Sequence, residues 1–418
     1  MLKLPRITSD FTKNVLKLMS GTALAHIATF IATPLLTRLF AKESLGELQL
    51  FISTITTFGV VSSLKYELAI VIPKDDDDGN ALAVLSLISL LLFSLLFTLM
   101  LTFVGGPFLR LFDAESLQPY LYFLALGVFL FGLMQSLQYV LVRHKKFGAL
   151  ATNKIVQVAS TQILAVTLGF FSDAVEILLY TQVLGYLLAA LLILNMKVVR
   201  FNVSWSRLWQ LARTNKKFPT INTSMVFLNT LSLQLPVFML SRYFTTEVVA
   251  LYSMANRLIN IPLFMIGRSV QQVYFQSASE AFHISKNRLL FVYKKTIVRL
   301  AAIAIIPLVI VLLAGPWIAG LYLGSAYTEA GVYMQIITFW MFFQFITSPV
   351  SQTFTIIDRQ EVGFYLIVAS LLVRLLAMSL FNTTPREMLF ALSIAAGLFY
   401  LFYNLYMYIL IKPSKSET

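Results

Sequence analysis

Long apolar segments recur along almost the whole chain, and they constrain its fold more than any other feature. Most of them are close to the 20 residues that a helix needs to cross the hydrocarbon core of a bilayer. Segments such as 81–104 are solidly apolar and lack the alternation typical of a β-barrel strand. The pattern predicts an all-α integral membrane protein with about 12 transmembrane helices, at about 14–37, 45–66, 81–104, 119–142, 154–172, 175–196, 220–241, 248–275, 292–314, 331–353, 361–381 and 387–411.

The composition excludes a water-soluble globular enzyme. Of the 418 residues 58% are hydrophobic and 12% are charged, whereas a soluble domain carries about 25% charged residues. The absence of cysteine rules out disulfides and thiolate metal sites. The net charge of +13 does not indicate a nucleic-acid partner, because the Lys and Arg residues lie in short clusters between apolar segments.

These clusters predict the orientation of the chain in the membrane. If alternate connections lie on the same side, 24 of the 32 Lys and Arg residues fall on one side, five on the other and three inside helices. Cytoplasmic connections carry the excess of positive charge. We therefore expect both termini to be cytoplasmic.

The longest cytoplasmic connection divides the chain into two sets of six helices. It runs from about 197 to 219, is basic, and contains Trp205 and Trp209. Its apolar spacing is typical of a short helix in the plane of the membrane interface, although a linker near anionic headgroups fits as well. The predicted domains are an N-terminal bundle over 1–205 and a C-terminal bundle over 206–418.

The two halves resemble each other. Residues 38–40 (Arg-Leu-Phe) correspond to 242–244 (Arg-Tyr-Phe), 204 positions later. The pair Ser136 and Gly148 recurs as Ser351 and Gly363, 215 positions later. With six helices in each half, the two bundles would be related by a pseudo-two-fold axis along the membrane normal, and substrate sites in such proteins lie between the repeats.

Polar residues form a stripe on the second predicted helix and again at the equivalent place in the eighth. Steps of three, four and seven residues place such side chains on one helical face. The stripe of the second helix contains Gln49, Ser53, Thr56, Ser63 and Glu67. The corresponding positions of the eighth are Ser253, Arg257, Asn260, Gly267 and Gln271, with Arg268 beside them. Lipid would penalise both stripes, so they should face protein or a hydrated cavity.

The individual residues leave both readings open. Arg257 lies in the middle of its span, beyond easy reach of the interface, which favours a hydrated cavity. Arg268 lies nearer the cytoplasmic end, and for Arg374 in the eleventh helix snorkelling and a cavity fit equally well. Asn222 and Asn229, seven residues apart in the seventh helix, fit the same cavity. His26 in the first helix is either a proton carrier or a packed, hydrogen-bonded group.

The sign of the charge inside the predicted helices indicates the class of substrate. Three arginines lie within spans, whereas no Asp or Glu does so clearly. A guanidinium binds phosphate bidentately and stays protonated, so the expected substrate is anionic and carries phosphate. The sequence has no phosphate loop of an ATPase and no catalytic motif. We expect no catalysis, no cofactor and no metal, and we interpret the aspartate run 75–78 as a solvated loop rather than a metal site.

Two segments of the first 80 residues carry a resemblance to a known family. Residues 34–40 (Pro-Leu-Leu-Thr-Arg-Leu-Phe) with Gly46, followed by 65–73 (Lys-Tyr-Glu-Leu-Ala-Ile-Val-Ile-Pro), resemble the opening of the Wzx-type polysaccharide flippases. These belong to the multidrug/oligosaccharidyl-lipid/polysaccharide exporter superfamily. The resemblance extends over the whole chain in length, number of helices and two-bundle repeat.

The resemblance implies a flippase of the bacterial inner membrane. Its substrate would be an undecaprenyl-diphosphate-linked oligosaccharide, the repeat unit of O-antigen (lipopolysaccharide), capsule or exopolysaccharide, moved to the periplasmic leaflet by alternating access through a cationic central cavity. A proton or sodium gradient would drive it, with His26 or Glu67 as coupling residue, and a polysaccharide polymerase or chain-length protein could be a partner. We assign substrate binding to Arg257, Arg268, Arg374, Asn260, Gln49, Ser53, Thr56, Asn222 and Asn229.

Two other functions stay open from the sequence. A cation-coupled multidrug exporter of the same superfamily would share the fold but should carry an acidic residue within the membrane. A non-transporting scaffold of a glycan-assembly complex would not need polar stripes at matched positions of both halves.

Overall fold

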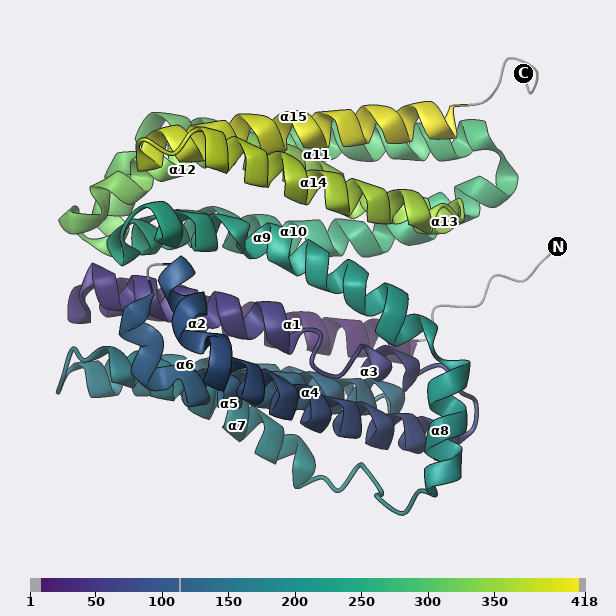
Figure 1. Ribbon diagram of the computed structural model, residues 1–418. Coiled ribbons are helices and arrows are strands. Elements are labelled where there is room, and N and C mark those ends of the chain that lie inside the picture. Colours follow the sequence, from purple (N-terminus) through teal and green to yellow (C-terminus); the bar gives the residue numbers. More distant parts are fainter. Residues whose placement is uncertain (1–8, 113, 413–418) are drawn as a thin grey trace. The chain divides into compact units, whose positions relative to one another are not determined.

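A computed structural model describes residues 9–112 and 114–412, except for the side chains of 9–20, 261, 262, 264–266, 268, 269 and 272. Every regular element within these limits is helical (Figure 1). The prediction of an all-α chain is therefore confirmed for the part of the sequence that the structure covers.

The chain forms two compact units, Met1–Thr230 and Leu231–Thr418. The elements of the first unit are α1 (Ser9–Leu39), α2 (Lys42–Gly59), α3 (Tyr66–Ala69), α4 (Asp76–Leu111), η1 (Glu115–Tyr120), α5 (Leu121–Arg143), α6 (Phe147–Gly169), α7 (Val175–Leu194), α8 (Trp205–Thr214) and the π-helical turn η2 (Phe218–Asn222). Helix α9 (Thr223–Tyr243) begins in the first unit and ends in the second. The second unit continues with α10 (Thr246–Ile284), α11 (Lys286–Leu323), η3 (Ser325–Tyr327), α12 (Thr328–Thr347), η4 (Pro349–Gln352), α13 (Thr353–Ile356), α14 (Gln360–Leu380) and α15 (Pro385–Ile411).

Nine helical segments in the described residues are long and apolar enough to cross a membrane. The three other long helices are α2, α6 and α10. Charged and amide side chains are frequent in α2 and α6, and α10 contains side chains that the structure does not describe. The protein is thus a multi-pass membrane protein, whereas its 12 spans remain a prediction.

The sequence repeat has a structural counterpart at the connection between the first two helices of each half. Helix α1 ends at Leu39 and α9 ends at Tyr243, 204 positions later. The following helices begin at Lys42 and Thr246, with the same offset. The helices then differ, because α2 stops at Gly59 whereas α10 continues for 39 residues, about 58 Å at 1.5 Å per residue.

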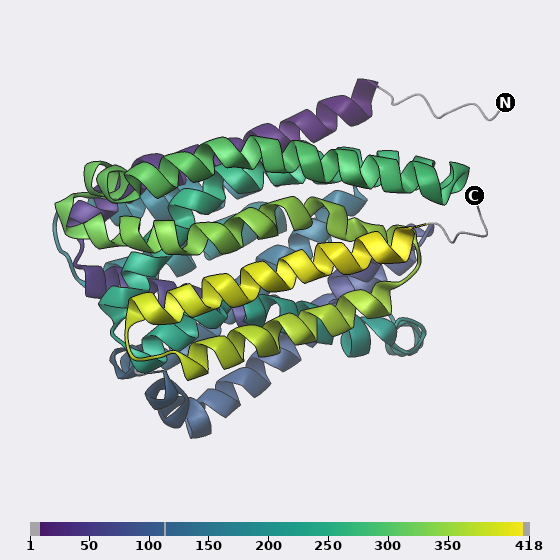
Figure 2. The same cartoon turned by 90° about the horizontal axis from the view of Figure 1, so that it is seen from above.

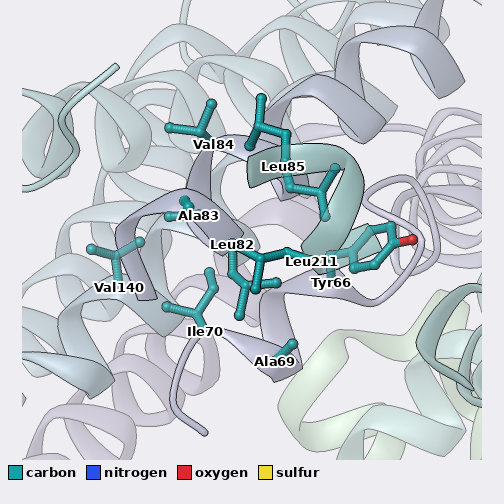
Figure 3. Packing of buried hydrophobic residues seen from close by; sticks show 11 residues of the cluster. Tyr66, Ala69, Ile70, Leu82, Ala83, Val84, Leu85, Val140 and Leu211 are labelled. Carbon is teal, nitrogen blue, oxygen red and sulfur yellow. The ribbon is translucent and has the colours of Figure 1, made fainter. Parts of the chain in front are cut away.

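Helix α8 belongs to the first unit and packs on its other helices. Its Leu208 and Leu211 are buried in one apolar cluster with Tyr66, Ile70 and residues of α4 (Figure 3). The Arg207 guanidinium also donates two hydrogen bonds to the Asp78 carboxylate, and Nε donates at 2.8 Å. The first compact unit extends to Thr230, and the predicted domains over 1–205 and 206–418 remain a prediction.

The orientation of α8 differs from that of the long helices beside it. Figure 1 shows it crossing the end of α4 at a steep angle. Its outer face carries Trp205 and Trp209, which are more than half exposed, and the Arg213 guanidinium lies 5.1 Å from the Trp209 ring centroid. Aromatic and basic residues on the exposed face of a short helix are typical of an element that lies in the membrane interface.

The second unit depends on a close approach of two glycines. Helices α11, α12, α15 and α14 run alongside one another (Figure 2), and each packs on the next. A Cβ atom on Gly331 of α12 would lie 2.3 Å from the Gly315 carbonyl oxygen of α11. Small residues allow helix backbones to approach in this way in membranes.

Large apolar side chains cover much of the outer surface of the helices. On α4, Leu95, Leu96 and Phe103 are at least two-thirds exposed, and on α11 Leu313 is 81% exposed. Water would penalise such a surface, whereas lipid accepts it. The exposure agrees with helices that are solvated by hydrocarbon.

Candidate functional site

The polar stripe of the second helix is present, but it is shorter than predicted. On α2 the Gln49 side-chain amide donates a hydrogen bond to the Ser53 hydroxyl at 3.2 Å, and Thr56 follows on the same face, partly buried. The helix ends at Gly59. Ser63 and Glu67 therefore do not continue the stripe on one helix, as the sequence spacing suggested, but lie in and after a turn.

This turn is held in an unusual backbone conformation. Leu64 and Lys65 have φ of 52° and 58°, the left-handed region that residues other than glycine rarely adopt. The turn brings the Lys65 ammonium to 2.7 Å from the Glu67 carboxylate, and both side chains are fully or almost fully buried. The acidic residue of the stripe is therefore neutralised by a cation two positions away.

The Glu67 carboxylate has two further hydrogen-bond donors. The Ser63 hydroxyl donates to Oε2, and the Gln135 side-chain amide of α5 donates to Oε1 at 2.9 Å. A buried ion pair is tolerated only when its remaining polar atoms are satisfied, and these contacts meet that need. Glu67 thus links the turn after α2 to helix α5.

The other sequence-predicted polar residues of the first unit are less enclosed. His26 on α1 and Asn222 at the end of η2 are partly buried, and Asn229 on α9 is exposed. Thr29 and Thr33, on the face of α1 that carries His26, bond to backbone carbonyls four residues earlier. Their hydroxyls are satisfied within the helix and carry no sign of a ligand site.

The eighth predicted helix corresponds to α10, which carries a pair of hydrogen-bonded asparagines. Asn260 donates a hydrogen bond to the Asn256 side-chain oxygen at 2.6 Å. Arg257 is next to Asn256 in sequence and is partly buried. The side chain of Arg268 lies outside the described residues, so its predicted role is not tested.

Arg374 occupies the interior of the second unit rather than an open cavity. It is 1% exposed and donates hydrogen bonds to the Ser232 carbonyl of α9 at 3.0 Å and to the Tyr400 hydroxyl of α15 at 3.1 Å. Its guanidinium carbon lies 4.9 Å from the Trp340 ring centroid and 5.7 Å from that of Tyr400. The interpretations from the sequence, snorkelling or a cavity wall, do not describe this packed position.

The charge of Arg374 is compensated only by neutral groups. A carbonyl, a phenol and two aromatic faces surround it, and its Nε has no hydrogen-bond partner among the described residues. Cation–π contacts of a desolvated cation stabilise it by about 2 kcal/mol or more. The result is a positive charge held inside a helical unit without a counter-ion from the described part of the chain.

The aspartate run is structural and only partly solvated. Asp75 caps α4 by accepting a hydrogen bond from the Asp77 backbone N–H, while Asp76 and Asp78 form ion pairs with Arg143 and Arg207. Arg143 also donates to the backbone carbonyls of Ile70, Pro73 and Asp75. In the described part of the chain, His, Asp and Glu residues form no group that could hold a metal ion.

Sequence reasoning missed the partners of the buried charges. Gln135 is far from Glu67 in sequence, as Trp340 and Tyr400 are from Arg374. A second missed group is Asn153 of α6, fully buried, which accepts from Gln138 and donates to the Ala189 carbonyl at 2.6 Å. Only the amide residues inside apolar segments, Gln135 and Asn153, could have indicated such contacts.

Comparison with known families decides what kind of protein this is. Residues 35–332 match the model of a family described as "polysaccharide biosynthesis protein". The chain belongs to the polysaccharide biosynthesis protein family. The matched residues include the α2–α3 turn, the Glu67 network and all of α10, and they confirm the family resemblance of the sequence. No curated protein matches the chain in sequence.

Solved structures with the same fold are transporters and flippases. One is a multidrug resistance MATE family transporter of the MOP superfamily in an inward-facing conformation, with a TM-score of 0.71, 17% identity, and 93% of this chain and 94% of that one covered. Another is the lipid II flippase MurJ in an inward closed conformation, with a TM-score of 0.73, 15% identity, and 94% and 89% covered. At these identities the likeness shows that the chain shares the fold of these two proteins.

Proposed function

We propose that the protein is a flippase for an undecaprenyl-diphosphate-linked oligosaccharide. It moves the repeat unit of a polysaccharide such as O-antigen from the cytoplasmic to the periplasmic leaflet of a bacterial inner membrane, by alternating access and with both termini in the cytoplasm. The family match supports the polysaccharide substrate, and the charge bias of the sequence supports the orientation.

One observation carries the choice of an anionic substrate. Lys65, Glu67 and Arg374 are the buried charged side chains of the described residues. Lys65 and Glu67 neutralise each other, so the charge that remains is the cation of Arg374. A site for organic cations needs a carboxylate or an aromatic cage, and here the aromatic faces already hold an arginine. A positive interior favours a diphosphate.

The residues divide into three roles in this proposal. Arg257 and Arg268 on α10 bind the diphosphate, because guanidinium groups bind phosphate oxygens bidentately. Sugar hydroxyls meet Gln49, Ser53, Thr56, Asn222, Asn229 and Asn260. Arg374, assigned above to substrate binding, contributes its charge and holds its helices together, because its buried side chain has no open path to a ligand. The prenyl tail stays in lipid.

Ion coupling is assigned to Glu67 or His26, with a proton or a sodium ion. The Glu67 carboxylate would release Lys65 on taking up the ion, and the strained turn at Leu64 and Lys65 could then rearrange. A polysaccharide polymerase or chain-length protein is the expected protein partner.

Ligand-induced thermal stabilisation of the purified protein tests the substrate class. An undecaprenyl-diphosphate sugar and a cationic dye are compared at low and high salt. A ligand that binds only the folded state stabilises it by about 2.7 kcal/mol at 100 times its Kd. We expect stabilisation by the lipid-diphosphate alone, lost in Arg257→Ala and largely kept in Arg257→Lys. Stabilisation by the dye alone would contradict the proposal and support a multidrug exporter.

A further inference from the structure

A groove runs along α10 and α11 in the second unit, and it changes from basic to apolar along its length. Its first part is a cavity of about 630 Å³ near the turn between the two helices. Its second part is a cavity of about 370 Å³ farther along the same helices. Ile303 lines both parts, so the two cavities adjoin each other at this residue.

The first part of the groove carries an excess of positive charge. Arg288, Lys295 and Arg299 of α11 line it, against the single carboxylate of Glu280 on α10. The Arg288 guanidinium and the Lys295 ammonium each lie 5.5 Å from the centroid of the Phe291 ring, which stands between them. The remaining polar side chains among the described lining residues, Tyr274, Ser277 and Thr296, carry hydroxyls. This is a set of groups that recognises phosphate.

The second part is apolar. Residues such as Leu258, Leu263, Ile306 and Phe342 line it, and among its described lining residues Thr338 is the single polar side chain. The Thr338 hydroxyl donates to the Met334 carbonyl of its own helix and so is satisfied. A hydrocarbon chain fits this surface, at about 0.8 kcal/mol for each buried methylene.

The depth of the cations matches the headgroup layer of a bilayer. Helix α11 carries no charge from Leu300 to its end at Leu323, about 36 Å of helix at 1.5 Å per residue. That length spans a hydrocarbon core of about 30 Å. Arg299 therefore lies at the edge of the core, Lys295 lies one turn farther out, and Arg288 lies about 16 Å beyond Arg299. This end of α11 is the one predicted to be cytoplasmic.

We propose that this groove binds one anionic phospholipid of the surrounding bilayer, with its phosphate between Lys295 and Arg299 and an acyl chain in the apolar part. A resident phospholipid fits better than the glycan-linked substrate, because the groove has few polar groups to receive sugar hydroxyls. Basic pockets between transmembrane helices on the cytoplasmic side bind anionic headgroups in this way. The described residues that line it include none of those assigned to transport, and the proposal does not depend on which lipid is transported.

Native mass spectrometry of the full chain in non-ionic detergent tests the site. The probes are phosphatidylglycerol and phosphatidylcholine with identical acyl chains. We expect one phosphatidylglycerol to bind preferentially and Lys295→Gln/Arg299→Gln to bind it about thirty-fold more weakly, from about 1 kcal/mol for each cation near the surface. The matched control is Lys286→Gln/Lys294→Gln, which removes the same charge from the same helix. Neither control residue lines the groove, and Lys294 faces the Tyr408 ring instead.

A second variant tests the apolar part independently of charge. Ile303→Trp adds bulk at the residue that lines both cavities and should reduce phosphatidylglycerol binding with all cations in place. Equal binding of the two phospholipids would overturn the proposal. Equal losses in the two charge variants would also overturn it, because they would indicate diffuse attraction. Displacement of phosphatidylglycerol by an undecaprenyl-diphosphate sugar would assign the groove to the substrate instead.

Discussion

Arg374 is a buried cation whose contacts in the described part of the chain are all with neutral groups, and it ties three helices of the second unit together. The Ser232 carbonyl of α9, the Tyr400 hydroxyl of α15 and the Trp340 ring of α12 all contact its guanidinium. Arg374→Lys keeps the charge but loses the planar fork that makes these contacts together. A substitution that keeps only the positive charge should therefore not keep these contacts.

We expect Arg374→Lys to lower the free energy of unfolding by about 2 to 4 kcal/mol, since it forfeits a hydrogen bond from a charged group and most of the cation–π contact. Thermal unfolding in detergent measures the change. Lys412→Arg, an exposed exchange of the same two residue types, is the control and should leave the midpoint unchanged. An Arg374→Lys variant as stable as the wild type would contradict this prediction, because the positive charge alone would then account for the contribution of Arg374 to stability.

The Lys65–Glu67 pair offers a second test at single residues. Removing one partner of a buried ion pair typically costs about 3 to 5 kcal/mol, because the other charge stays buried. Lys65→Met should therefore destabilise the protein strongly, and Lys65→Met/Glu67→Gln should recover part of the loss. A double-mutant cycle on thermal midpoints measures the coupling. Additive effects of the two substitutions would mean that the pair is not formed in solution.

At the scale of the elements, the sequence predicts the helices well and their interruptions poorly. The turn between α1 and α2 and its counterpart before α10 follow from the repeated Arg-x-Phe segments and appear with the same offset. The break of α2 after Gly59 was missed, because Leu64 and Lys65 adopt a left-handed conformation that their residue types do not favour. The same break invalidated the part of the polar stripe beyond Thr56.

The contacts of the buried charges Glu67 and Arg374 could not be predicted from the sequence, for a different reason. Glu67 was recognised as the last member of a polar stripe, and Arg374 as a charge within an apolar segment. Their partners Gln135 and Trp340 are neutral residues far away in the chain, and nothing in local spacing marks them. Burial of Arg374 in packed protein rather than in a cavity depends on these partners.

The close approach of α11 and α12 gives a prediction about an element pair. Gly331→Ala would place a methyl group against the Gly315 and Pro316 backbone, and overpacking of this kind costs about 1 to 3 kcal/mol. Gly363→Ala in α14 is the matched control, since its added methyl group meets nothing within 4 Å. It should be neutral or slightly stabilising, by up to about 1 kcal/mol. The thermal unfolding midpoints of both variants test this prediction. Equal midpoints would contradict the close packing of α11 against α12 at Gly331.

At the scale of the whole molecule, three independent findings agree. The family is one of polysaccharide biosynthesis, the fold is that of transporters and flippases, and the buried charge left after ion pairing in the described residues is positive. The fold alone does not select a substrate, because the MATE transporter and the lipid II flippase resemble the chain almost equally. In the proposed function, the sign of the buried charge is what favours a lipid-diphosphate over a cationic drug.

Transport in reconstituted vesicles tests that central claim most directly. A fluorescent undecaprenyl-diphosphate oligosaccharide is placed in the inner leaflet, and its appearance in the outer leaflet is followed with an enzyme or quencher that cannot cross the membrane. We expect the wild-type protein to accelerate flipping, Arg257→Ala to reduce the rate at least ten-fold, and Arg257→Lys to keep most of it. Flipping no faster than in protein-free vesicles, together with uptake of a cationic dye, would contradict the account.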